Sequence, residues 1–170
     1  SKVTEMSAMF YDCNSLISIN LKNFNTESAK YMNGMFYGCS KLKSIDVSNF
    51  DTSSVIKMTV LFQECHSLLS LDLNNFNTSS VIDMNSMFNH CLSLKILNLQ
   101  SFDTSSVTNF HGIFKYCVSL LSLNISSFNT SSANNLNQMF LGCRSLISLD
   151  LSHFSTSSVN KINYMLNETN

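Results

Sequence analysis

The sequence predicts an α/β solenoid of about six and a half coils, each made by 26 residues. Three observations support this fold class. Six cysteines recur at one constant step, two phenylalanine series and a threonine series keep that step, and the apolar spacing within each unit changes from strand-like to helix-like. A fixed period of this length is typical of stacked supersecondary units, so we expect residues 1–170 to form a single solenoid domain. The repeats begin at Cys13, Cys39, Cys65, Cys91, Cys117 and Cys143.

The part of each unit that follows the cysteine is predicted to be a short strand. Leu71 and Leu73 alternate with Ser70, Asp72 and Asn74, which is the two-residue period of a half-buried strand. Strands of successive coils then form a parallel sheet with a spacing of about 4.8 Å, and the inward side chains form continuous columns. The sequence has no proline, which fits a sheet in which every strand donates hydrogen bonds to its neighbour.

The second part of each unit is predicted to be a short helix, α or partly 3₁₀, on the opposite face of the solenoid. Residues 77–80, Asn-Thr-Ser-Ser, offer side-chain oxygens that can cap the first N–H groups of a helix. Val81, Met84, Met87 and Phe88 then follow at helical spacing. We therefore expect helices on one face of the stack and the parallel sheet on the other.

The composition restricts the possible functions. Only 12% of the residues are charged and the net charge is −1, so no basic field is available for nucleic acid. With 44% hydrophobic residues the chain is too apolar to be disordered, yet no apolar run approaches the roughly 20 residues that cross a bilayer. Phosphate-binding glycine loops, nucleophile elbows and zinc-protease motifs are missing from the sequence. We expect no enzymatic activity, no cofactor, no nucleic-acid partner and no direct membrane insertion.

The repeat resembles the leucine-rich repeats of the BspA-like class, in the 26-residue subtype. Residues 35–47 carry its Met-Phe-x-x-Cys-x-x-Leu-x-x-Leu-x-Leu pattern, with Ile45 and Val47 at the last two apolar places, and residues 50–58 carry Phe-Asp-Thr-Ser-Ser-Val-Ile-Lys-Met. The resemblance implies a curved solenoid within a longer exported protein, located at the cell surface or outside the cell. It also implies adhesion or the binding of a host protein or glycan. It names no ligand, because the shared residues are interior ones.

The outward side chains of the predicted strands are the candidate binding surface, since they form one extended concave face in a solenoid. This face is polar, small and nearly uncharged, and it lacks the Trp, Tyr and Arg anchors of many protein interfaces. We expect it to contact a host or extracellular protein or a glycan. The candidate binding residues are Ser44, Asp46, Ser70, Asp72, Asn74, Asn98, Gln100, Asn124 and Asp150.

Two further groups of side chains can add contact area. One is aliphatic and follows the first strand leucine, at the rim of the concave face. The other is aromatic and lies near the turn that precedes the strand, where such residues more often cover the end of the core. The two groups are Ile17, Leu69, Leu121 and Ile147, and Tyr11, Tyr37 and Tyr116.

Three other features favour structural interpretations. Stacking brings the six thiols within the Cα separation of about 4.4 to 6.8 Å that disulfides need, so disulfides between neighbours are an alternative to the favoured column of buried free thiols. Metal binding is disfavoured because no Cys-x-x-Cys pair exists. The threonine column from Thr26 to Thr156 suits capping and hydrogen bonds along the stack better than an ice-binding or glycan-binding array. Asp46 and Asp72 are expected to be solvated rather than to bind Ca²⁺.

Two functions from different classes follow. The leading hypothesis is a non-catalytic binding and adhesion module that uses the concave sheet. The alternative is a structural spacer or self-assembling element, which associates end to end through its terminal coils and has no ligand of its own.

Overall fold

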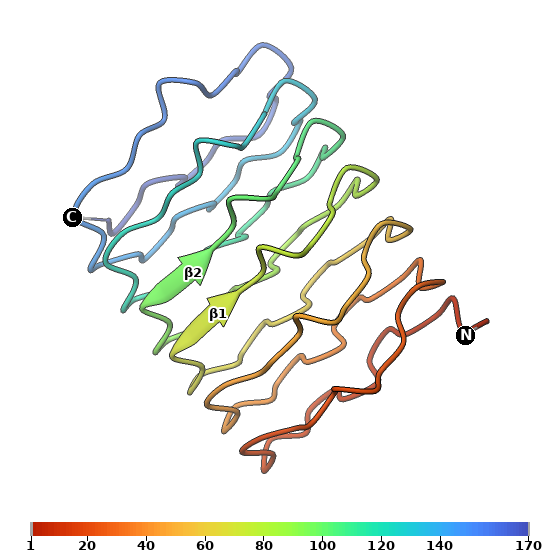
Figure 1. Ribbon diagram of the computed structural model, residues 1–170. Helices are drawn as coiled ribbons and strands as arrows, with labels where there is room; N and C mark the ends of the chain where they lie inside the picture. The colour runs from red at the N-terminus through yellow and green to blue at the C-terminus, as the bar shows by residue number, and fades with distance from the viewer. Residues whose placement is uncertain (1, 170) are drawn as a thin grey trace.

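The computed structural model describes residues 2–169, which form a stack of similar coils that runs from the N-terminus at one end to the C-terminus at the other (Figure 1). Strands β1 (Ser70–Asp72) and β2 (Ile96–Asn98) lie on neighbouring coils and pair in parallel. Ser70 pairs with Ile96 and Asp72 with Asn98, so one sequence repeat advances the sheet by one strand. The predicted repeat solenoid is confirmed. We call the wall formed by residues 17–22 and their equivalents in later repeats the strand wall.

The opposite wall is also a parallel ladder, and we call it the turn wall; it is formed by residues 4–13 and their equivalents. The backbone N–H groups of Met6 and Ala8 donate to the carbonyls of Tyr31 and Asn33, at 2.9 and 2.8 Å. Single bridges connect each coil of this wall to the next. They run through Glu5, Tyr31, Lys57, Asp83, Asn109, Asn135 and Lys161.

The predicted helices are wrong: residues 2–169 contain no helix. The segment after Val81 is a run of tight turns, in which the N–H of Met87 donates to the Met84 carbonyl and that of Cys91 to the Phe88 carbonyl. The third residue of each of these turns, Ser86 or His90, has a positive φ of 54° or 60°, as in type II turns.

Coil spacing explains why turns replace helices. The turn wall is bridged from coil to coil in the same parallel manner as the strand wall, which requires neighbouring segments about 4.8 Å apart. Packed helices need 8 to 10 Å between axes, roughly twice that spacing. Since the chain forms no helix within residues 2–169, it has no helical segment long and apolar enough to span a bilayer.

The core between the two walls consists of columns of equivalent side chains. Phe36, Phe62, Phe88 and Phe114 are fully buried, and neighbouring rings in this column stack with centroids 5.5, 6.1 and 5.8 Å apart. Leu71 and the other inward leucines of the central coils complete the interior. The inward and outward faces predicted for the strand part are therefore confirmed.

Candidate functional site

All of the candidate binding residues lie on the outer side of the strand wall. Asn98 is half-buried and the others are exposed, namely Ser44, Asp46, Ser70, Asp72, Asn74, Gln100, Asn124 and Asp150.

The acidic and amide residues of this set also shape the backbone. Oδ1 of Asp72 accepts a hydrogen bond from the N–H of Asn74 at 3.1 Å, and Oδ1 of Asp46 accepts one from the N–H of Ser48 at 3.0 Å. This Asx turn ends each strand segment after a few residues. The pKa of the Asp46 carboxyl is lowered, mainly by a hydrogen bond from the Ser48 side chain and to a smaller extent by the one from the Ser48 N–H. The same turn recurs at Asn20, Asn98, Asn124 and Asp150.

Aliphatic side chains project from the strand wall beside these polar residues. The rim residues Ile17, Leu69, Leu121 and Ile147 are 58%, 51%, 51% and 83% exposed, as their sequence position suggested. Ile96 is 67% exposed and stands where the other five repeats have Ser. This departure from the repeat is the feature of the sequence that could have identified Ile96 as a candidate contact residue. We call Leu69, Ile96, Leu121 and Ile147, which lie on four successive coils, the aliphatic stripe.

Two shallow depressions of the strand wall differ in their chemistry. The first, of about 540 Å³, is acidic because Asp46 and Asp72 both line it, together with Ser48 and Asn74. The second, of about 310 Å³, contains part of the aliphatic stripe and a set of amides. Its lining is Lys95, Ile96, Leu97, Asn98, Leu99, Gln100, Ser122 and Asn124.

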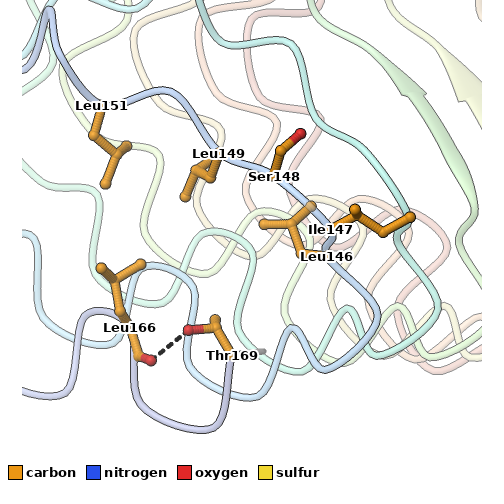
Figure 2. Close-up of a pocket in the computed structure, with 7 residues that line it drawn as sticks. All are labelled: Leu146, Ile147, Ser148, Leu149, Leu151, Leu166 and Thr169. Atoms are coloured by element: carbon orange, nitrogen blue, oxygen red, sulfur yellow. Dashed lines mark hydrogen bonds between the residues drawn. The ribbon is translucent and has the colours of Figure 1, made fainter.

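A third groove, of about 220 Å³, lies along the last coil (Figure 2). Leu149 and Leu151 point into it and are only half-buried, whereas the equivalent Leu71 and Leu73 are 2% and 0% exposed. The groove is completed by Leu146, Ile147, Ser148, Leu166 and Thr169.

The cysteines are free thiols, of which five are buried and Cys13 is exposed. Each buried thiol donates to a carbonyl of the preceding coil, as Sγ of Cys91 does to the Phe62 carbonyl at 3.2 Å. Burial raises the pKa of the Cys39 and Cys143 thiols to about 11 and about 12. The favoured column of buried free thiols is therefore correct except at Cys13. Residues 2–169 bring together no group of three or more His, Cys, Asp or Glu side chains that could hold a metal.

The threonine column is buried from Thr26 to Thr130 and joins neighbouring coils. The Thr52 hydroxyl donates to the Asn77 carbonyl at 2.9 Å and accepts from the Asn77 N–H at 2.8 Å. The predicted hydrogen bonds along the stack are confirmed, and the buried part of the column cannot serve as an exposed array.

The three tyrosines do not form one patch. Tyr11 and Tyr37 stack with ring centroids 4.5 Å apart, and the Tyr37 hydroxyl donates to the Glu64 carboxylate at 2.8 Å. That hydrogen bond is the main reason why the pKa of Tyr37 rises to about 12. Tyr116 lies about three coils further along, where its ring contacts His90 at a centroid distance of 4.7 Å.

Comparison with known proteins first defines the class. A leucine-rich repeat protein from Bacteroides ovatus, known from its crystal structure, has a similar fold, with a TM-score of 0.50 and 19% sequence identity. The match covers 96% of this chain and 44% of that protein, so the chain spans less than half of its length. The likeness supports a leucine-rich repeat solenoid.

The family follows from a second comparison. A model of the family described as "Mycoplasma protein of unknown function, DUF285" matches residues 1–97 and 90–170. The chain therefore belongs to this family. A search of curated proteins finds no match.

Proposed function

We propose that the protein is a non-catalytic binding and adhesion module of an exported surface protein of the BspA-like type. It contacts a host or extracellular protein or glycan through the strand wall. The observation that carries this proposal is the aliphatic stripe, which stands beside exposed polar side chains on one wall. Exposed apolar side chains rimmed by polar ones are typical of interaction sites.

The way the wall is held supports this function. The Asn75 side-chain amide donates to the carbonyls of Val47 and Phe50 on the preceding coil, at 2.9 and 3.1 Å. Asx turns and buried threonine hydroxyls fix the backbone at the ends of the same segment. A wall that is already ordered loses little conformational entropy when it binds a ligand.

The chemistry of the interior is compatible with a location outside the cell. Thiolates, not thiols, react in oxidation and disulfide exchange. Five of the six thiols are buried, and burial raises the pKa of Cys91 and Cys117 well above the ordinary value. These thiols therefore resist an oxidising environment without the need for disulfides.

Capture by immobilised ligands tests the proposal. The protein is applied to an array of extracellular-matrix proteins and glycans, together with a variant that carries Asp72→Arg and Asn98→Arg on the strand wall. We expect the wild type to be captured and the double variant to be captured more weakly. The double variant also loses two Asx turns, at Asp72 and Asn98, so urea unfolding should show a small loss of stability but a folded protein. The matched control is Asn134→Arg, an exposed position on the turn wall. Equal weakening by the control, or an array without capture, would overturn the proposal.

A second candidate is the structural spacer that associates end to end. In that function the contacts between copies include the groove of Figure 2, which Leu149, Leu151 and Leu166 line. Sedimentation over a range of concentrations tests it, with Leu166→Asp as the variant that should abolish oligomers. The spacer function is preferred if oligomers form in this way and the array shows no capture.

A further inference from the structure

We infer that the ligand of the strand wall is a protein segment that carries aliphatic or aromatic side chains and a carboxylate. These apolar side chains pack on the aliphatic stripe, and the carboxylate lies at Lys95. This inference rests on the proposed binding function and names the partner class and the residues that select it.

The stripe provides the apolar contact. Its four side chains are each at least half exposed and lie on consecutive coils, so the stripe extends over three coil steps, or about 14 Å. Four to five residues of an extended peptide span that length at about 3.3 Å per residue. Polar residues on the same strands then form the rim around an apolar centre, which is the usual arrangement of a protein interface.

Lys95 is the one charged residue at the stripe's own positions on these four coils, and it favours a partner that carries a carboxylate. The stripe uses two outer positions of each repeat, those of Leu69 and Ser70. In the six repeats these positions hold only Ile, Leu, Ser and two lysines, Lys43 and Lys95, and no acidic residue. The aspartates of the wall, such as Asp72, stand at a different position, three residues after that of Leu69. Lys95 is exposed and lines the same depression as Ile96. A carboxylate can therefore approach Lys95 without a neighbouring like charge on these two positions.

The same depression can hold the backbone of a bound segment. Asn98, Gln100 and Asn124 line it, and each amide side chain offers both donors and an acceptor. Oδ1 of Asn98 and of Asn124 already accepts a backbone N–H, whereas a side-chain amide carries two N–H donors besides. A peptide carbonyl is a suitable acceptor for such donors.

These features favour a protein over a glycan. Aliphatic side chains gain free energy when other apolar side chains remove them from water, and a polyhydroxylated sugar replaces that water with further polar groups. An exposed lysine adds little affinity to such a contact, but it adds specificity and speeds association.

Selection from a random peptide library displayed on phage tests the inference. The wild-type chain is the immobilised target, and enriched peptides are synthesised with a fluorophore for anisotropy titrations. We expect enriched sequences to combine Leu, Ile, Phe or Tyr with Asp or Glu. Leu121→Asp should weaken their binding by about tenfold or more, because it places a charge in the stripe. Lys95→Gln should weaken binding less and reduce its dependence on salt.

Ile82→Asp is the matched control, since Ile82 is 42% exposed on the turn wall and lies outside the stripe. Urea unfolding of each variant shows whether it keeps the wild-type stability. A failure to enrich peptides, enrichment without acidic residues, or equal binding by wild type and Leu121→Asp would overturn the inference. Glycan capture that survives Leu121→Asp but is lost with Asp72→Arg and Asn98→Arg would also overturn it, and would leave the proposed function intact.

Discussion

The strand wall and the turn wall repeat with the same step, yet they use their side chains differently. On the turn wall the outward polar residues bond to one another, as Asn33 does when its Oδ1 accepts from the N–H and the hydroxyl of Thr59. On the strand wall, Leu121 and its partners in the stripe point into solvent. The comparison indicates that outward side chains of the turn wall join neighbouring coils, whereas those of the aliphatic stripe are left to the proposed ligand. The predictions below test this division, beginning with the interior that both walls share.

Truncation of the shared interior should have the largest effect. Leu71 is 2% exposed on β1, so Leu71→Ala leaves a cavity and should lower the free energy of unfolding by about 2 to 5 kcal/mol. Ser70→Ala changes the exposed face of the same strand and should cost almost nothing. Urea denaturation of both variants measures the two effects, and equal values would contradict the assigned faces.

Loss of a threonine hydroxyl should have the next largest effect. The buried Thr78 hydroxyl donates to the Asp103 carbonyl at 2.8 Å, and valine keeps the shape but not the hydrogen bond. Thr78→Val should lower the free energy of unfolding by about 0.5 to 1.5 kcal/mol, since it removes a hydrogen bond between neighbouring coils. In contrast, Thr108 is exposed and donates to the Ile82 carbonyl at 3.2 Å, so Thr108→Val should change stability much less.

A substitution on the turn wall should stabilise the protein. Val60 has a φ of 52°, a region that β-branched residues seldom adopt, and the equivalent Gly34 and Gly112 show which residue fits. Val60→Gly should raise the free energy of unfolding by about 1 kcal/mol. The reciprocal variant Gly112→Val should lower it. Thermal unfolding of the pair decides, and a destabilised Val60→Gly would show that valine packing outweighs backbone strain.

Acidification should weaken the turn wall by a smaller amount. Burial lowers the pKa of His90 and His111, and in the described residues the buried Nδ1 of His90 has no hydrogen-bond partner. Glu64 opposes the shift of the His90 pKa, whereas Lys115 and His66 add to it. Because the folded state then binds fewer protons than the unfolded chain, stability is present above about pH 6.5 and falls as the pH drops through that value.

Urea midpoints at about pH 7.5 and about pH 5.5 measure this loss. Asn adopts positive φ readily, so His90→Asn keeps the turn and should reduce the loss. A midpoint that rises on acidification would contradict the prediction.

Much of the fold was predictable because the stacked side chains of different repeats constrain one another and so fix the register between coils. A cysteine or phenylalanine column stacks only if every coil has the same length, so the constant step predicted the pairing of Ser70 with Ile96. The turns were missed because Val81, Met84, Met87 and Phe88 suit a helix face and a run of inward-pointing turns equally well. Positive φ falls on residues such as Val60 and Tyr116, which carry no glycine signal.

The site was predicted in position but not in detail. The two-residue period predicts Asp46 and Asp72 on the outer face. It does not predict the Asx turns that these carboxylates form with Ser48 and Asn74, because the same spacing suits solvent-exposed side chains. Leu69 and Ile147 are exposed because two consecutive residues face solvent at this point of the backbone, for example Leu69 and Ser70. A strict alternation of faces does not predict such a pair.

In the cysteine column, each buried thiol is covered by the neighbouring coils. Sγ of Cys65, Cys91, Cys117 and Cys143 each donates to a carbonyl of the coil before it, so a thiol becomes accessible only when the adjoining coils separate. The order in which an alkylating reagent modifies these cysteines therefore shows whether the coils separate first at the N-terminal or at the C-terminal end of the stack. The rate of alkylation at each cysteine therefore measures local opening of the solenoid at the resolution of a single repeat.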